Sequence, residues 1–481
     1  MLRKALIFLG LSVLVSVGAV AYLLEEMGRT PRELAPYIER RVEGHNPLIV
    51  GAGNWVGQTL RTLDRMEGGI FAVDMLKQGA HAIPTAPIMP PETSANEVTV
   101  SSPEQARVAI GNAKPGDTIT FLPGTYAFSG SNIFASKAGT AAAPITLRAG
   151  QLGTVTLLFS LSEGFLVSAP YWTIENLRIE GKCQHQSNCE HAFHVVGKAH
   201  HFIARNNVIV DFNAHFKINK SGDAIPDDGL IEYNTISNTS ARRTESSVTL
   251  IDLVAASRWR IRHNVITDFI KDGSDRISYG AFVKGGGSDN RIEQNVVICE
   301  HRLRGQTGKR VGLSLGGGGT GQAYCPNQRC ITEQDRGVVA SNLILACSDD
   351  GIYLNKAAAS RIINNTLIDT GGIVVRFPES TADVDNNLVD GKIRARDGGL
   401  IRESNNRDTH LSSLFVGYHP VRALFRQASV MDLQWHGKPQ MMATDTEKMP
   451  DLCGASRGAQ SLIGAFDDFG ACLAPSDAPT K

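Results

Sequence analysis

An asparagine set in a short apolar run recurs through the middle of this chain, as in "IARNNVIV", "IEYNTI", "IRHNVI" and "IINNTLI". Successive asparagines are separated by 31, 27, 30, 31, 47, 23 and 22 residues. Such a period predicts a solenoid, because a coil of short strands buries its apolar residues only against neighbouring coils. A side-chain amide both donates and accepts, so stacked asparagines can bond successive coils. We therefore assign these residues to the scaffold: Asn176, Asn207, Asn234, Asn264, Asn295, Asn342, Asn365 and Asn387.

A second strand precedes each asparagine strand, for example "HFKINKS" and "AFVKGGG". Side chains alternate between the two faces of a strand, so the repeat predicts columns that run across the coils. The residues expected to point inward are Val195, Ile218, Ile251, Val283, Leu354 and Val375. One outward column is then Val196, Asn219, Asp252, Lys284, Asn355 and Arg376. A second is His194, Lys217, Leu250, Phe282, Leu313, Tyr353 and Val374.

Composition agrees with a turn-rich all-β protein. The chain has 48 glycines and only 6% aromatic residues. Lys+Arg and Asp+Glu number 48 each, so the bulk charge gives no indication of a nucleic-acid partner. We predict a parallel β-helix over residues 97–400. Residues 401–481 lack the repeat and are expected to cap its open end.

The N-terminus predicts export. Ala5–Leu24 contains no charge and is long enough to cross a bilayer, with Arg3 and Lys4 before it. We interpret residues 1–27 as an inner-membrane anchor, with a cleaved signal peptide as the alternative. Residues 28–96 read as a helical, membrane-proximal stalk and a Pro-rich linker, and residues 28–78 as a docking element for an envelope protein.

The eight cysteines are expected to pair in an oxidising compartment. Short spacings predict Cys183–Cys189 and Cys325–Cys330, and Cys453–Cys472 would tie the C-terminal segment. Cys299 and Cys347 remain, and both follow asparagine strands of neighbouring coils. A zinc site is the alternative for one stretch, "CQHQSNCEH", whose potential ligands are Cys183, His185, Cys189 and His191.

Two motifs near the start of the repeat resemble a known family. "AIGNAKPGDTI" and "GTAAAPITLRAG" resemble the opening of the right-handed parallel β-helix polysaccharide enzymes. The resemblance is to the chondroitinase B and alginate lyase family, to which the mannuronan C5-epimerases are related. It implies a right-handed coil and activity on an acidic polysaccharide, cleaved by β-elimination. Members of the family use a lysine and an arginine on neighbouring coils and hold calcium with asparagine and glutamate. The "E-x-E" and "D-P-H-D" patterns are absent here, so those residues are not carried over.

β-Elimination on a uronate makes three demands: a cation for the sugar carboxylate, a base for the C5 proton and an acid for the leaving oxygen. Lys217 or Lys284 is the candidate base, and His215 or His194 the candidate acid. Asp252 and Asp228 are candidate oxygen ligands for Ca²⁺. The residues expected to bind substrate are Asn219, Asp252, Tyr353, Asn355, Lys356 and Arg376.

Other interpretations stay open at this point. The outward strip could be a solvated face, and the protein a non-catalytic glycan-binding or envelope-scaffold protein, because a fold of this kind hosts both. Epimerase and hydrolase activities are further alternatives. The pairs Asp227-Asp228 and Asp349-Asp350 suit an inverting hydrolase, but each precedes a glycine and is interpreted here as a turn.

Overall fold

The structure is a computed structural model that describes residues 22, 26, 28–69, 71–82, 96–317, 320–326, 328–437, 441–443, 449–458 and 460–473. Ala5–Leu24, apart from Tyr22, and most of the predicted linker lie outside the described residues. Among the helices that are described, none is long and apolar enough to cross a membrane.

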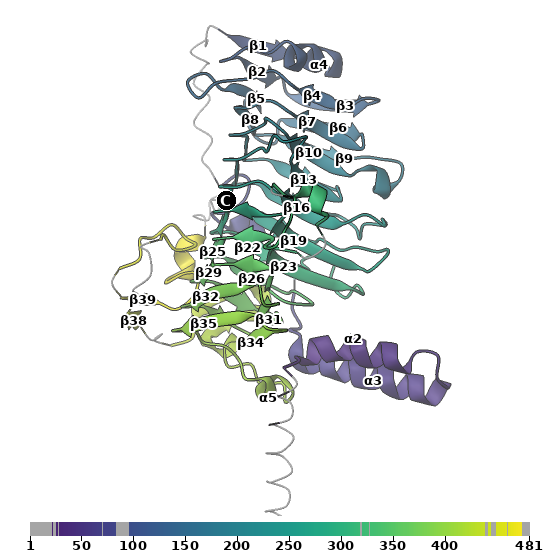
Figure 1. The fold of residues 1–481 in the computed structure, drawn as a ribbon, viewed down its shortest axis with the longest axis vertical. Coiled ribbons are helices and arrows are strands. Elements are labelled where there is room, and N and C mark those ends of the chain that lie inside the picture. Colours follow the sequence, from purple (N-terminus) through teal and green to yellow (C-terminus); the bar gives the residue numbers. More distant parts are fainter. Residues whose placement is uncertain are drawn as a thin grey trace, which may run out of the picture.

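Three long parallel sheets make up the body of the described chain (Figure 1). Each coil contributes one strand to sheet 1, then one to sheet 3, then one to sheet 2. Sheet 1 consists of β1 (Glu97–Val100), β2 (Thr118–Phe121), β5 (Ile145–Ala149), β8 (Trp172–Glu175), β11 (Ile203–Arg205), β14 (Leu230–Glu232), β17 (Arg260–Arg262), β21 (Arg291–Glu293), β25 (Val338–Ala340), β29 (Ser360–Ile363), β32 (Thr381–Asp385) and β35 (Leu400–Ser404).

Sheet 2 consists of β4 (Ile133–Ala135), β7 (Glu163–Val167), β10 (His191–Val196), β13 (Ala214–Asn219), β16 (Val248–Val254), β19 (Ile277–Lys284), β23 (Lys309–Leu315), β27 (Ile352–Asn355), β31 (Gly372–Arg376) and β34 (Lys392–Arg396). Sheet 3 consists of β3 (Gly124–Ser129), β6 (Val155–Ser160), β9 (Arg178–Gly181), β12 (Val208–Val210), β15 (Thr235–Ser237), β18 (Val265–Thr267), β22 (Val296–Ile298), β26 (Leu343–Leu345), β30 (Thr366–Ile368) and β33 (Leu388–Val389). The predicted parallel β-helix is confirmed, with the right-handed coil that parallel crossovers adopt.

The asparagine ladder stands at the tight turn between sheets 1 and 3. Asn234 Nδ2 donates to Asn264 Oδ1 at 3.1 Å, and Asn264 Nδ2 donates to Asn295 Oδ1 at 3.0 Å. The ladder begins at Asn207 and continues to Asn406, one coil beyond the predicted end. Asn176 is not part of it, because Leu177 takes the ladder position in that coil and donates its amide to Asn207. Asn176 instead has a positive φ of 62°, a conformation that asparagine tolerates.

Aromatic residues fix the register of sheet 2 from inside the coil. Phe165, Phe193 and Phe216 occupy successive strands with their rings stacked, at centroid distances of 5.5 and 4.9 Å. Such ring pairs add about 0.5–1.5 kcal/mol each beyond the burial of their area. The outward neighbours of these residues are therefore held in line from coil to coil.

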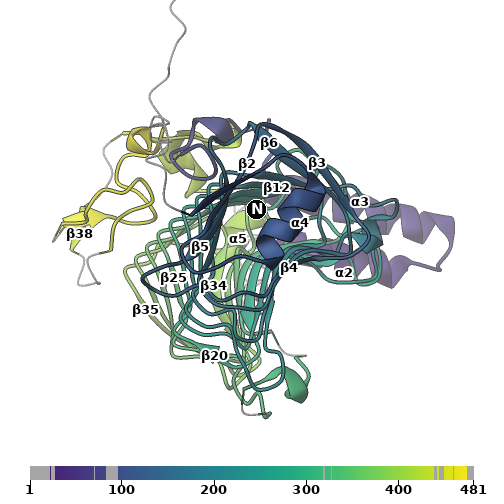
Figure 2. The same cartoon turned by 90° about the horizontal axis from the view of Figure 1, so that it is seen from above.

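Both ends of the β-helix are covered. Helix α4 (Pro103–Gly111) lies across the first coils, as Figure 2 shows, and buries Ala106 and Ile110. Helix α5 (Leu411–Leu414) lies at the other end. The chain then returns along sheet 3, where Phe466 and Phe469 pack with Val296 and Leu343. Short strands complete this part: β36 (Phe425–Gln427), β37 (Asp432–Trp435), β38 (Met441–Ala443) and β39 (Gln460–Leu462).

The predicted N-terminal helices are present as a hairpin of α2 (Pro31–Val42) and α3 (Pro47–Asp64). The second helix begins at Pro47, where Asn46 caps its first turn by accepting from the amides of Leu48 and Ile49. Residues 71–82 do not continue as a helix. They run along the β-helix instead, where the Lys77 amide donates to the Cys472 carbonyl and the Gly79 amide to that of His263.

All four predicted disulfides are formed: Cys183–Cys189, Cys299–Cys347, Cys325–Cys330 and Cys453–Cys472. The zinc alternative for "CQHQSNCEH" is therefore wrong, because both of its sulfurs are committed to a disulfide.

Candidate functional site

Strand pairing in sheet 2 places the outward residues in columns. His194 pairs with Lys217, Lys217 with Asp252, and Asp252 with Phe282. Asp252 therefore stands in the column of Lys217, and Val254 stands between Asn219 and Lys284. The predicted column was wrong at this strand by two residues. Every residue of β16 is buried, so no polar and apolar alternation marks its register.

The corrected register brings two lysines to one carboxylate. Lys217 Nζ donates to Asp252 Oδ2 at 2.5 Å, and Lys284 Nζ lies 3.8 Å from Asp252 Oδ1. The Asp252 side chain is 6% exposed, whereas those of Lys217 and Lys284 are 25% and 20% exposed. Burial alone would raise the pKa of Asp252, but the two ammonium groups hold it below its ordinary value.

Lys284 is the less constrained of the two lysines. Its Nζ makes the longer contact with Asp252 and lies 4.4 Å from the centre of the Phe282 ring, a cation–π contact. Asp252 Oδ1 is buried and makes no hydrogen bond within the described residues. The pair of lysines thus shares one negative charge, and this part of the face carries excess positive charge.

A histidine and a glutamate form the neighbouring part of the strip. His194 Nδ1 lies 2.8 Å from Glu163 Oε1, and His194 Nε2 lies 2.8 Å from Asn219 Oδ1. Asn219 Nδ2 donates to the Lys220 carbonyl, which turns the amide oxygen toward the ring. Both ring nitrogens therefore face acceptors, and the doubly protonated imidazolium satisfies both. The hydrogen bond from His194 lowers the pKa of Glu163.

The Cys325–Cys330 loop covers one side of this part of sheet 2. Lys220 Nζ donates to the Cys325 carbonyl at 3.2 Å, so the Cys325–Cys330 loop reaches back to the end of β13. Glu333 accepts from the Gly285 amide at 2.9 Å, directly after Lys284. A small sheet lies beside it: β20 (Gly287–Ser288), β24 (Gln334–Asp335) and β28 (Ala357–Ala358). The insertion between Asn295 and Asn342 thus forms one side of the site.

The remaining predicted binding residues lie further along the same sheet. Arg376 donates to the Tyr353 hydroxyl at 3.4 Å and pairs with Asp397. Asn355 Nδ2 donates to the same hydroxyl at 3.2 Å. Lys356 lies 3.7 Å from Glu379. Strand β23 separates Tyr353 and Asn355 from Lys284, so these two residues lie about 10 Å along the coil axis from Lys284, and Arg376 lies one coil further.

Two predicted site residues lie elsewhere. His215 is fully buried beside Phe212, and its Nε2 lies 3.0 Å from the Ser237 carbonyl. Burial lowers the pKa of His215 to about 3, so its ring does not offer a proton near neutral pH. Asp228 is held on a turn with φ of 65° by two hydrogen bonds from Arg258. We therefore leave both residues out of the site.

The structure adds residues that the repeat did not indicate. Glu163 lies at the start of β7 and reaches His194 from the preceding coil, and Asn132 donates to its other oxygen at 3.0 Å. The His191 ring lies 5.3 Å from that of His194, and Nδ1 donates to the Ala214 carbonyl. Burial and the neighbouring charges of His194 and Lys217 lower the pKa of His191 to about 4. No motif marks these residues, since their neighbours come from other coils.

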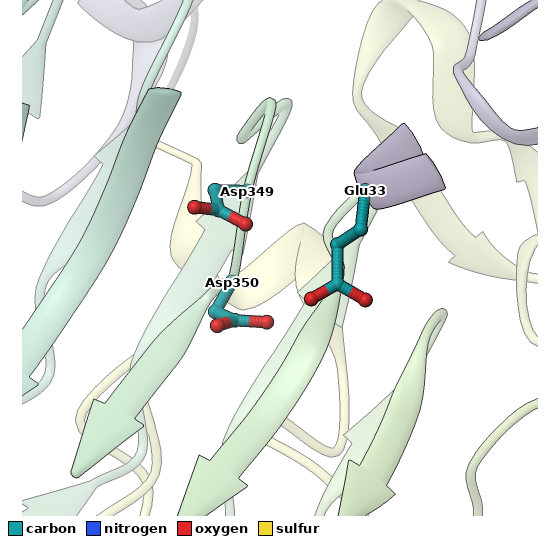
Figure 3. Close-up of side chains that lie close together, drawn as sticks. All are labelled: Glu33, Asp349 and Asp350. Carbon is teal, nitrogen blue, oxygen red and sulfur yellow. The ribbon is translucent and has the colours of Figure 1, made fainter. Parts of the chain in front are cut away.

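Calcium does not fit the residues named for it. Ammonium and guanidinium groups already occupy the carboxylates of Asp252 and Asp228. One compact acidic group exists in the described chain: Glu33, Asp349 and Asp350 lie within 4.8 Å of one another (Figure 3). Cations surround this group as well: Lys309, Arg394 and Arg396. A divalent ion would have to displace them, so we derive no step through a metal.

Solved structures with a similar architecture include the pectate lyase Pel9A, at 16% identity over 75% of this chain and 90% of that chain, with a TM-score of 0.48. An alginate lyase from Paenibacillus sp. str. FPU-7 has 16% identity over 65% and 99%, with a TM-score of 0.36. The GH136 lacto-N-biosidase from Eubacterium ramulus has 11% identity over 65% and 68%, with a TM-score of 0.41. No family model and no curated protein matches the chain. At these values the likeness is one of fold alone.

Proposed function

We propose that the protein is a lyase that cleaves a uronate-containing polysaccharide by β-elimination. The observation that carries the proposal is the continuous set of charged and hydrogen-bonding groups on adjacent coils of sheet 2: Glu163, His194, Asn219, Lys217, Asp252 and Lys284. These coils are about 4.8 Å apart, so the set spans a few sugar units. Four disulfides favour an oxidising compartment, so we place the activity in the periplasm or outside the cell.

The lysine pair would serve the first half of the reaction. The Lys284 ammonium, 3.8 Å from Asp252, neutralises the uronate carboxylate and so acidifies the C5 proton. Lys217, as the neutral amine, takes that proton, and the electron pair of the broken C5–H bond forms the C4–C5 double bond. Lys217 suits this role better than Lys284, because it pairs with His194 on the adjacent strand, whereas Lys284 stands three strands from His194.

His194 would serve the second half. As the C4–O bond breaks, the departing glycosidic oxygen needs a proton, and the imidazolium of His194 supplies it. Glu163 then stays ionised and holds the ring in place, consistent with its lowered pKa. One proton is taken and one is given, so the step balances without a metal or other co-reactant.

The test is an assay of the purified chain against a panel of uronate polymers, following the ultraviolet absorbance of the unsaturated product. We expect Lys217→Ala and His194→Ala each to reduce the rate by about 100-fold or more, the usual contribution of a positioned acid or base. Lys182→Ala is the matched control, because Lys182 also pairs with a carboxylate, at 2.9 Å from Glu180, but follows β9 of sheet 3.

The outcomes separate the candidate functions. Product formation that survives both Lys217→Ala and His194→Ala would remove these residues from the mechanism. Saturable binding of one polymer without any unsaturated product would instead favour the glycan-binding alternative. Activity that is unchanged by a chelator is expected, since the acidic groups are already paired with cations.

A further inference from the structure

The helical hairpin α2–α3 projects away from the β-helix in both views (Figures 1 and 2). Its base is fixed: buried Arg32 donates to Asp64 at 2.6 Å, to Asp369 at 2.9 Å and to the Cys347 carbonyl at 2.7 Å. A buried guanidinium with this many partners holds the hairpin in one orientation. The rest of the hairpin extends from this anchored base.

The two helices pack closely through glycines. A Cβ at Gly53 would lie 2.4 Å from Val42, and one at Gly57 would lie 2.4 Å from Glu39. Arg61 closes the pair with two hydrogen bonds of 2.5 Å to Glu39. This close packing uses small residues on the inner side of α3, and its larger apolar residues are left facing outward.

The exposed residues of α3 up to Thr59 are uncharged, and three of them are large and apolar. Leu48 is 85% exposed, Ile49 43% and Trp55 70%. Leu48, Ala52 and Trp55 follow the spacing that places residues on one helix face. From Pro47 to Leu60 the chain contains no charged residue and no histidine. An exposed helix normally carries charge, so this face is built to be covered.

We propose that the exposed face of α3 lies in the interfacial layer of a lipid bilayer. The sequence before the hairpin favours this occupant, because Ala5–Leu24 has the length and composition of a bilayer-crossing segment. Six residues lie between Leu24 and Pro31, so the two are at most about 25 Å apart. A bilayer entered by that segment is within reach of α3.

The hairpin has the two sides that interfacial helices show. Apolar residues, including a tryptophan, lie on α3, while exposed Arg40 and Arg41 lie on α2, where long side chains can reach headgroups. Helix α3 is about 27 Å long. Its apolar face would give the β-helix a second attachment to the bilayer, in addition to the segment Ala5–Leu24.

The fluorescence of Trp55 measures this contact directly. The chain has four tryptophans, of which Trp172 and Trp259 are fully buried and Trp435 is partly buried. The full chain is placed in vesicles of phosphatidylcholine and phosphatidylglycerol, with and without brominated acyl chains. The Trp55 emission is obtained by subtracting the Trp55→Phe variant. We expect brominated lipid to quench it and aqueous iodide to leave it unquenched.

Variants test whether the apolar face of α3 causes the quenching by brominated lipid. Leu48→Asp combined with Ile49→Asp should abolish the quenching by brominated lipid and expose Trp55 to iodide. Val108→Asp is the matched control, because Val108 is 62% exposed on α4 at the far end of the β-helix, and it should change nothing. Trp55 that is open to iodide in the unaltered chain would overturn the proposal. Protection from both quenchers, with a dimer in sedimentation, would overturn it in favour of a second copy.

Discussion

Sheet 2 carries two groups of charged side chains in one line of columns, and they differ in exposure. Around Asp252, the lysine side chains are 25% and 20% exposed, and the Cys325–Cys330 loop covers only one side of the region. Around Asp350, the first turn of α2 covers the sheet, and the side chains of Arg394, Asp350 and Glu33 are 7%, 7% and 5% exposed. Arg394 stands in the same column as Lys217, since the pairings run from Lys217 through Tyr353 to Val374 and Arg394.

The difference shows how one repeated surface serves two purposes. In the covered region, opposite charges come from distant parts of the chain and hold the N-terminal segment on the β-helix. In the open region, the charges come from adjacent coils and remain accessible to a ligand. Charged residues of the same types are structural where another segment of the chain covers and pairs them. They are candidates for function where their side chains stay accessible.

Removal of one cation from the covered group should have the largest effect on stability. Arg394→Ala leaves Glu33 and Asp350 buried beside each other without the guanidinium that contacts both. We expect a loss of about 3–5 kcal/mol in the free energy of unfolding. Chemical denaturation measures it, and Arg402→Ala, whose side chain is 82% exposed, is the control that should stay close to the parent. An Arg394→Ala chain as stable as the parent would contradict the structural role of this group.

The covered group should also make stability depend on pH. Burial, with the carboxylate of Asp349 beside it, raises the pKa of Asp350 from 3.8 to about 8. Between these values the folded chain holds a proton that the unfolded chain releases, so this contribution to stability is largest at low pH and is lost as pH rises to about 8. Asp350→Asn keeps the side chain neutral and should remove this loss of stability at high pH.

The measurement compares the two chains at two pH values. At pH 4 the denaturation midpoints should nearly coincide, and at pH 9 the Asp350→Asn chain should be more stable by a few kcal/mol. Asp397→Asn is the control, since Asp397 also pairs with an arginine but is 46% exposed. If the Asp350→Asn chain is less stable than the parent at pH 9, the folded chain favours the charged form of Asp350.

Much of the scaffold could be predicted because it repeats. The ladder asparagines recur at each coil, and the disulfide of Cys299 and Cys347 follows from their equal positions on neighbouring coils. The register of Asp252 could not be predicted, because a slip of two residues leaves inward and outward faces unchanged. The sequence signal was clear where polar and apolar residues alternate, and absent in β16, which is buried throughout.

The candidate site was predictable only in part. Lys217, Lys284 and His194 stand at outward positions of the repeat, so the pattern alone indicated them. His215 also alternates outward with Lys217, but its ring is buried and contacts the carbonyl of Ser237, the last residue of β15. Glu163 and Glu33 reach their partners from other coils or from the N-terminal segment. The Arg32 contact to Cys347, for example, joins residues 315 apart, which no local pattern encodes.

A substitution at the far end of the open face should weaken binding without stopping the reaction. Arg376 lies beside Tyr353 and Asn355, beyond the lysine pair, so in a lyase it would contact a sugar away from the reacting bond. We expect Arg376→Ala to raise KM by about tenfold with kcat nearly unchanged, the signature of uniform binding. Steady-state kinetics measures both, with Arg361→Ala of sheet 1 as control. A fall in kcat alone would place Arg376 in the chemical step.

The smallest effect is expected for the lysine that corresponds to Arg394 in the open region. Lys217→Ala removes the 2.5 Å partner of Asp252, yet Lys284 Nζ remains 3.8 Å from the other oxygen of the same carboxylate. Because Lys217 is partly exposed, its ion pair should contribute only about 1 kcal/mol to the free energy of unfolding. Denaturation of Lys217→Ala and Arg394→Ala side by side measures the contrast. A loss for Lys217→Ala as large as that for Arg394→Ala would mean that the lysine pair is also structural. A small loss of stability, accompanied by a large loss of lyase activity, would mark the open group as retained for function.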